Sequence, residues 1–82
     1  MSEKINESVK VVAEFGKGQL KPLYFSWRGR NYPVKGIEFI HWRNIGESKI
    51  YSISLLSNNG TNYLLEFNSV SFVWRLIGAE IY

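Results

Sequence analysis

Arginines beside aromatic residues are the feature of this 82-residue sequence with the clearest potential for chemistry. The stretch Trp27-Arg28-Gly29-Arg30-Asn31-Tyr32 holds two guanidinium groups, and Trp42-Arg43 and Trp74-Arg75 repeat the pairing. Arginine can bind phosphate or carboxylate through two parallel hydrogen bonds, and exposed aromatic rings can stack on bases. Both residue types are also enriched at protein–protein hot spots. The candidate binding residues are therefore Arg28, Arg30, Asn31, Arg43 and Arg75.

A purely structural interpretation of the same pairs stays open. Side chains alternate between the two faces of a strand, so each tryptophan would point into the core if the arginine next to it faced water. A buried tryptophan cannot stack on a base, and an arginine stem lying over an aromatic ring is ordinary surface packing. The arginines would then need no ligand.

Catalytic and metal-binding residues are scarce. The chain has one histidine, no cysteine and no aspartate, and its seven glutamates are isolated from one another. We expect no enzyme activity, no metal and no cofactor, because neither a nucleophile with its base nor a metal-ligand set is evident. His41 is expected to be a structural strand residue. Gly16-Lys17-Gly18 lacks the full phosphate-loop pattern and is typical of a plain turn.

Composition indicates one small domain. Aromatic residues make up 16% of the chain, the net charge is +3, and no disulfide can form. Large rings bury much apolar area, which helps a short chain to build a core. We find neither a secretory signal nor the roughly 18 apolar residues of a membrane span, so the expected location is cytoplasmic.

Apolar residues recur with a period of two almost throughout, which predicts strands. We expect an all-β fold of about six antiparallel strands, in a strongly bent sheet or a small, partly open SH3-like barrel. Residues 1–7 are predicted to be a flexible N-terminal tail, and 8–82 a single β domain. The predicted strands cover residues 9–15, 23–28, 32–43, 49–57, 61–67 and 72–77, the last with a short helix as the alternative.

Turn residues predict how these strands pair. A four-residue loop over 28–31 would set Trp27 opposite Tyr32 and leave Pro33, which has no N–H, at a position without a ladder bond. Gly36 is expected to mark a bulge or a sharp bend in the third strand.

Asn59-Gly60 is the favoured pair for a two-residue type I′ turn. That turn predicts Leu56 opposite Tyr63, and Ser54 opposite Leu65, on one face of the hairpin.

The segment Pro22-x-x-Phe25-x-Trp27-Arg28-Gly29-Arg30-x-Tyr32-x-Val34 resembles the signature stretch of a small bacterial domain of unknown function. Tyr63-x-Leu65-x-Phe67 and Trp74-x-Leu76 are similar to its later part. The resemblance implies a bacterial source and a domain of this size, rich in tryptophan and arginine. It brings no established activity.

These observations favour a non-catalytic binding module. A protein-interaction or assembly domain, with a protein partner or a second copy, is the leading hypothesis. The alternative is single-stranded nucleic-acid binding through the candidate arginines. The most informative observation is whether those arginines converge on one face, because dispersed arginines would leave both hypotheses without a site.

Overall fold

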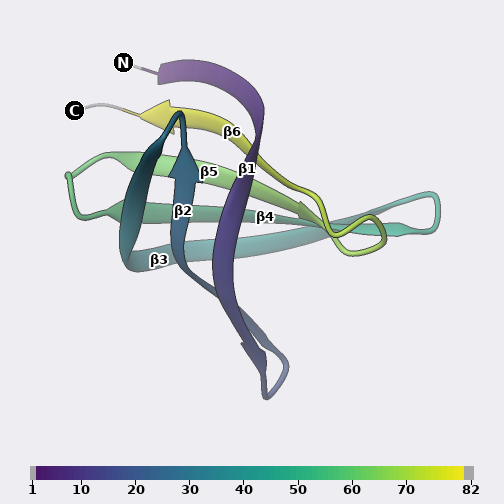
Figure 1. The fold of residues 1–82 in the computed structure, drawn as a ribbon. Helices are drawn as coiled ribbons and strands as arrows, with labels where there is room; N and C mark the ends of the chain where they lie inside the picture. Colours follow the sequence, from purple (N-terminus) through teal and green to yellow (C-terminus); the bar gives the residue numbers. More distant parts are fainter. Residues whose placement is uncertain (1, 81–82) are drawn as a thin grey trace.

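The computed structural model describes residues 2–80 and contains six antiparallel strands (Figure 1). This confirms the predicted all-β class. In chain order the strands are β1 (Ser2–Gly16), β2 (Gln19–Trp27), β3 (Arg30–Ile45), β4 (Ser48–Ser57), β5 (Asn62–Asn68) and β6 (Trp74–Glu80).

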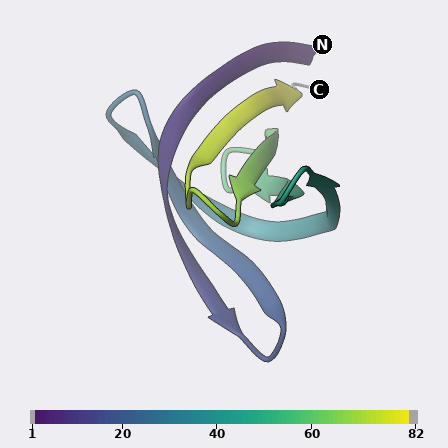
Figure 2. The ribbon, with the colours of Figure 1, turned by 90° about the vertical axis from the view of Figure 1, so that its right-hand side faces the viewer.

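The strands form one ringed sheet in chain order, which β6 closes by pairing with β1. The lengths of the ladders are very unequal. β3 and β4 pair through ten positions, whereas β2 and β3 pair only through the four from Tyr24↔Pro33 to Trp27↔Arg30. Beyond those four pairs the β1–β2 and β3–β4 hairpins diverge, and their tips point in different directions in both views (Figures 1 and 2).

The N-terminal segment belongs to the sheet, where the sequence predicted a flexible tail over 1–7. Ser2 pairs with Glu80, and the ladder continues through Lys4↔Gly78 to Val9↔Trp74, interrupted by a bulge before Glu7. The segment was predicted to be a tail because most of its residues are polar. Its one aliphatic residue after Met1, Ile5, is half-buried and packs against the core. Met1 lies outside the described residues.

The inner face of the ring holds the core. Phe25, Ile53, Leu55, Leu65 and Leu76 are fully buried there. Alternation places them, because inner residues two apart along a strand share one face. Burying such large aliphatic and aromatic side chains contributes about 1.5–3 kcal/mol each.

The turn between β2 and β3 corrects the predicted loop. It contains two residues, Arg28 and Gly29, both with positive φ, and it pairs Phe25 with Tyr32. The Phe25 and Tyr32 rings stack with centroids 5.0 Å apart. The turn lies one residue earlier than the centre of the predicted loop. Pro33 is therefore opposite Tyr24, at a position without a ladder bond, so proline is accommodated by a different register.

The β4–β5 hairpin also differs from its prediction by one position. Leu55, not Leu56, pairs with Tyr63, and Ile53 pairs with Leu65. The Ser57 N–H donates to the backbone oxygen of Thr61, and the Gly60 N–H donates to the backbone oxygen of Ser57. These bonds enclose a three-residue loop instead of a two-residue turn. The added loop residue brings Leu55 and Leu65 to the same buried face.

Two other expectations are settled. Irregular pairing on both sides of Gly36 confirms the expected bulge. The last element is the strand β6, which starts at Trp74, so Phe72 and Val73 lie in the preceding turn. No helix long and apolar enough to span a membrane occurs within residues 2–80.

Close approach of β1 to β6 makes Gly78 sensitive to substitution. A Cβ at this position would lie 2.9 Å from the backbone oxygen of Glu3. We expect Gly78→Ala to lower the free energy of unfolding by about 1–3 kcal/mol, as overpacking does. Chemical denaturation measures this. Gly36→Ala is the control, because a Cβ there meets no atom within 4 Å; equal losses in both variants would contradict the prediction.

Candidate functional site

Arg28 lies at the β2–β3 turn and bonds to β1. Its Nη2 donates to Glu7 Oε2 over 2.7 Å, and the Trp27 indole N–H donates to Glu7 Oε1 over 3.3 Å. The guanidinium also lies over the Trp27 ring, 4.7 Å from its centroid. These bonds lower the pKa of Glu7, chiefly through the Arg28 hydrogen bond, and raise the pKa of Arg28.

The other two candidates at this turn behave differently from each other. Asn31 Oδ1 accepts a 2.6 Å hydrogen bond from Ser26 Oγ on the paired strand. The side chain of Arg30 is exposed and has no hydrogen bond or ion pair with another described residue.

Arg43 and Arg75 lie on the outer face of the sheet, on either side of Glu66. Arg43 donates to Ser52 Oγ and to Glu66 Oε2, over 3.3 and 3.4 Å. Arg75 pairs with Glu66 across the strands, but its side chain donates to Oδ1 and to the backbone oxygen of Asn6, both over 2.8 Å. Asn6 has a positive φ and forms the bulge of β1. Arg75 therefore stabilises the bulge.

The five sequence-predicted residues thus divide between the β2–β3 turn and the outer face, and four of them bond to their own chain. The expected inward tryptophans are only partly found. Trp74 is buried and Trp27 half-buried, whereas Trp42 is 57% exposed.

A large groove lies between the diverging hairpins and was not predicted. Its volume is about 980 Å³. We call it the aromatic groove, because its aromatic lining residues are Phe15, Trp42, Tyr51, Phe67 and Phe72. The aliphatic side chains of Leu20, Ile37 and Ile40 complete the apolar lining.

Register explains why these rings gather. Trp42 pairs with Tyr51, Tyr51 with Phe67, and Phe67 with Trp74, so four aromatic residues form one row across β3, β4, β5 and β6. Phe15 reaches Phe67 from β1, with ring centroids 5.9 Å apart. Phe67 is therefore the buried floor, whereas Phe15, Trp42 and Phe72 are the exposed sides.

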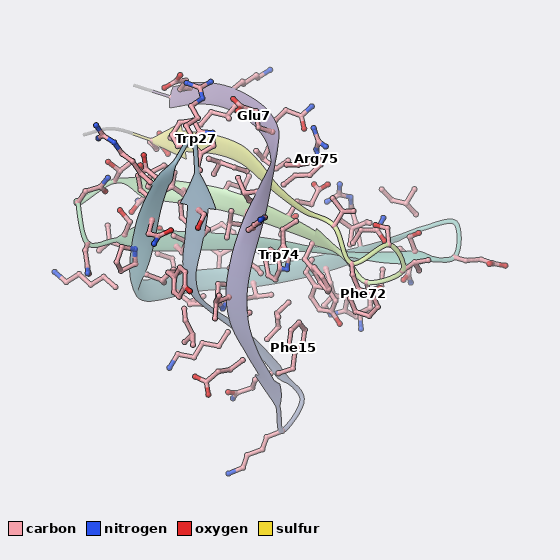
Figure 3. The ribbon with its side chains drawn as sticks, in the orientation of Figure 1. Glu7, Phe15, Trp27, Phe72, Trp74 and Arg75 are labelled. Atoms are coloured by element: carbon pink, nitrogen blue, oxygen red, sulfur yellow. The ribbon has the colours of Figure 1, made fainter. Side chains whose placement is uncertain are left out.

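Phe72 is held over the groove by a tightly bonded turn. Its N–H donates to the backbone oxygen of Asn68 over 2.8 Å. The side-chain Oδ1 of Asn68 accepts from the N–H groups of Val70 and Ser71. The residue has φ 58 and is 71% exposed, and its ring lies 5.8 Å from that of Phe67. Figure 3 shows Phe72 and Phe15 at the lower side of the ring, away from Glu7 and Trp27.

Charge in the groove is only positive. Lys21 and Lys49 line it, and no acidic residue does. The Lys49 ammonium lies 4.1 Å from the centroid of the Trp42 ring and 5.3 Å from that of Tyr51. The ion pairs within residues 2–80 are Arg28–Glu7 and Arg43–Glu66, so no carboxylate neutralises either lysine.

His41 does not contribute to the groove. It is exposed on the outer face of β3, where its ring meets that of Phe39 at 4.8 Å. Within the described part of the chain, no three His, Cys, Asp or Glu residues lie close enough together to hold a metal ion.

Sequence reasoning missed the groove, and the unusual pattern nearest to it marks β3 without marking the groove itself. After Gly36 both alternating sets of β3 residues are apolar: Ile37, Ile40 and Trp42 on one face, Phe39 on the other. A strand with a single core-facing side should alternate apolar with polar residues. The bulge before Phe39 brings Ile37, Ile40 and Trp42 to one face, so the residue that departs from this rule is Phe39, which does not line the groove.

No protein-family model, curated protein or solved structure matches this chain. The resemblance of residues 22–34 to a small bacterial domain therefore stays a prediction.

Acid should weaken the Glu7–Arg28 contact. Because the folded-state pKa of Glu7 is lowered, its contribution to stability is complete above the ordinary carboxyl pKa of about 4.3 and is lost as pH falls through the lower value. Glu7→Gln should therefore lower the melting temperature at pH 7 and have less effect at pH 3. Thermal denaturation of both proteins from pH 7 to pH 3 tests this prediction. A difference in melting temperature that did not change with pH would contradict a stabilising role for the ionised Glu7 carboxylate.

Proposed function

We propose that this protein is a non-catalytic interaction module that binds an extended apolar segment of a partner protein in the aromatic groove. The observation that carries the proposal is the exposure of Phe15, Trp42 and Phe72 around a concave, aromatic surface. A location in the cytoplasm is part of the same proposal.

Size and composition support ligand binding. Ligand pockets are concave, mostly apolar and about 300–1,000 Å³ in volume, and the groove lies within that range. Isolated exposed apolar residues are common on protein surfaces, but contiguous patches mark interaction sites. Here the exposed rings border one shared cavity.

The backbone of Phe72 gives independent support. A left-handed conformation costs a non-glycine residue about 1–2 kcal/mol, and exposure of the ring adds no compensating burial. Strained residues persist where the surrounding structure holds them, and they cluster at binding sites. The bonded turn around Asn68 holds Phe72 in this way, which favours a role for its ring in binding.

Single-stranded nucleic acid is the second candidate. Exposed aromatic rings next to lysines are the features on which bases stack and phosphates bind. Two lysines and no arginine line the groove, however, which is little positive charge for tracking a phosphate backbone. We therefore favour a peptide ligand.

A displayed library of random twelve-residue peptides, selected on the whole protein, tests the proposed function. We expect enrichment of peptides with aromatic or aliphatic residues at alternating positions. Counter-selection on a Trp42→Ala, Phe72→Asn double variant should remove them. Failure to enrich any peptide, or enrichment that the double variant retains, would overturn the proposal.

Phe72→Asn separates binding from stability. Asparagine tolerates the left-handed conformation, so we expect the free energy of unfolding to change by less than about 1 kcal/mol. Affinity for a selected peptide should fall at least about fivefold, corresponding to roughly 1 kcal/mol. Fluorescence anisotropy measures the affinity. Val70→Asn is the matched control, because Val70 is an exposed apolar residue of the same turn that does not line the groove.

Binding to a labelled oligothymidine, measured at low and at moderate salt, tests the alternative. We expect no salt-dependent binding at micromolar protein. Nucleic-acid binding would instead weaken steeply as salt rises. Tight, salt-sensitive binding that Trp42→Ala abolishes would favour the nucleic-acid function over the peptide function.

A further inference from the structure

One edge of the long strand β3 carries no neighbouring strand beyond Pro33. β3 pairs with β2 only as far as Pro33, and its other edge is fully occupied by β4. The edge that borders the groove is therefore without a partner strand within residues 2–80 as far as the hairpin tip at Ile45. Unpaired strand edges are templates for pairing with another chain.

Register identifies the backbone groups on this edge. The two-residue turn at Gly46 and Glu47 makes Ile45↔Ser48 a hydrogen-bonded pair, and bonded pairs alternate with non-bonded pairs along an antiparallel ladder. Arg43 and His41 therefore bond to β4. Ile40, Trp42 and Asn44, at the alternate positions, direct their N–H and C=O groups away from β4.

Ile40 and Trp42 contribute both their side chains and their unpaired backbone groups to the same region of the structure. Ile40 and Trp42 line the aromatic groove, and their free backbone groups lie at its border. A strand added there would form main-chain hydrogen bonds with β3, and every second side chain would enter the groove, as in β-strand addition.

The opposite border of the groove is less suited to pairing. Pro22 of β2 is the counterpart of Ala13 in a non-bonded pair, so its backbone nitrogen points away from β1, to the edge of β2 on the groove side, without a hydrogen atom to donate. Proline on an edge strand blocks strand addition. The groove therefore has one receptive edge, on β3.

Charge limits which peptide fits. Lys21 and Lys49 are the charged lining residues and neither has a carboxylate partner in the described structure. An anionic side chain on the ligand would supply the missing partner, whereas a basic ligand would be repelled.

We propose that the free edge of β3 receives an extended peptide as an added β-strand, whose alternate apolar side chains fill the aromatic groove and whose acidic residues pair with Lys21 and Lys49. This inference rests on the proposed peptide-binding function and specifies its geometry. A segment of about seven residues spans the regular part of the edge from Phe39 to Ile45.

Amide hydrogen exchange tests the geometry, with the tightest-binding library peptide as the probe. In the free protein, the amides of Ile40, Trp42 and Asn44 should exchange faster than those of His41 and Arg43, which β4 protects. Saturating peptide should slow the three edge amides at least tenfold and leave the two protected amides nearly unchanged. Binding without edge protection would overturn the added-strand geometry but leave peptide binding standing.

N-methylation of the peptide at one residue at a time provides a second test. We expect losses of affinity at alternate residues, because only every second N–H of an added strand faces β3. Losses that do not alternate would contradict strand addition.

Lys49→Gln should weaken binding of the acidic peptide several-fold and should not affect a variant peptide whose acidic residues are replaced by glutamine. Equal losses for both peptides would contradict the charge assignment.

Sedimentation of the free protein distinguishes a second copy as the occupant. We expect a monomer whose edge amides exchange quickly. A dimer in which the edge amides of Ile40, Trp42 and Asn44 are protected without peptide would show that the edge pairs with another molecule of this chain, and would overturn the proposal.

Discussion

Early termination of the pairing between β2 and β3 determines most of this structure. A ringed sheet closes only where neighbouring strands bond, and here that contact ends at Pro33 while both flanking hairpins continue. The closed part buries a compact core, and the continuing parts separate. One feature therefore produces both the groove, which lies in the gap, and the free edge of β3 beside it. The core and the aromatic groove are adjacent parts of one sheet.

Much of the fold could be predicted because burial on one face imposes a period of two on the sequence. The pairing within hairpins could not be predicted as well, because it depends on which residues accept a positive φ. Arg28 is an unexpected turn residue, and its conformation coincides with bonds to Glu7, which lies 21 residues earlier in the chain. Local preference alone favours the glycine of a turn and says nothing of such a distant partner. An error of one position then exchanged the faces predicted for Leu55 and Leu56.

The candidate site was harder to predict because residue type is a poor guide to exposure. Arginine beside tryptophan attracted attention, yet Arg28, Arg43 and Arg75 bond to glutamate, serine and asparagine side chains of their own chain. The rings of the groove come from four strands and a turn, and they meet only after folding. What the sequence did contain was apolar residues on both faces of β3 after Gly36, and three apolar residues, Val70, Phe72 and Val73, in an exposed turn. Both depart from the rule that the polarity of the residues in a strand or turn should match their solvent exposure. Such departures occur at functional sites.

The ladder between β1 and β6 brings the two ends of the described chain together, since Ser2 pairs with Glu80 (Figure 1). Neighbouring termini allow a domain to be inserted into a loop of another protein, or its ends to be joined and new ones opened elsewhere. Phe15 lies near the opposite end of β1 from Ser2, so attachments made at the termini leave the aromatic groove accessible. The fold is thus suited to insertion into a host protein without a change in its own sheet.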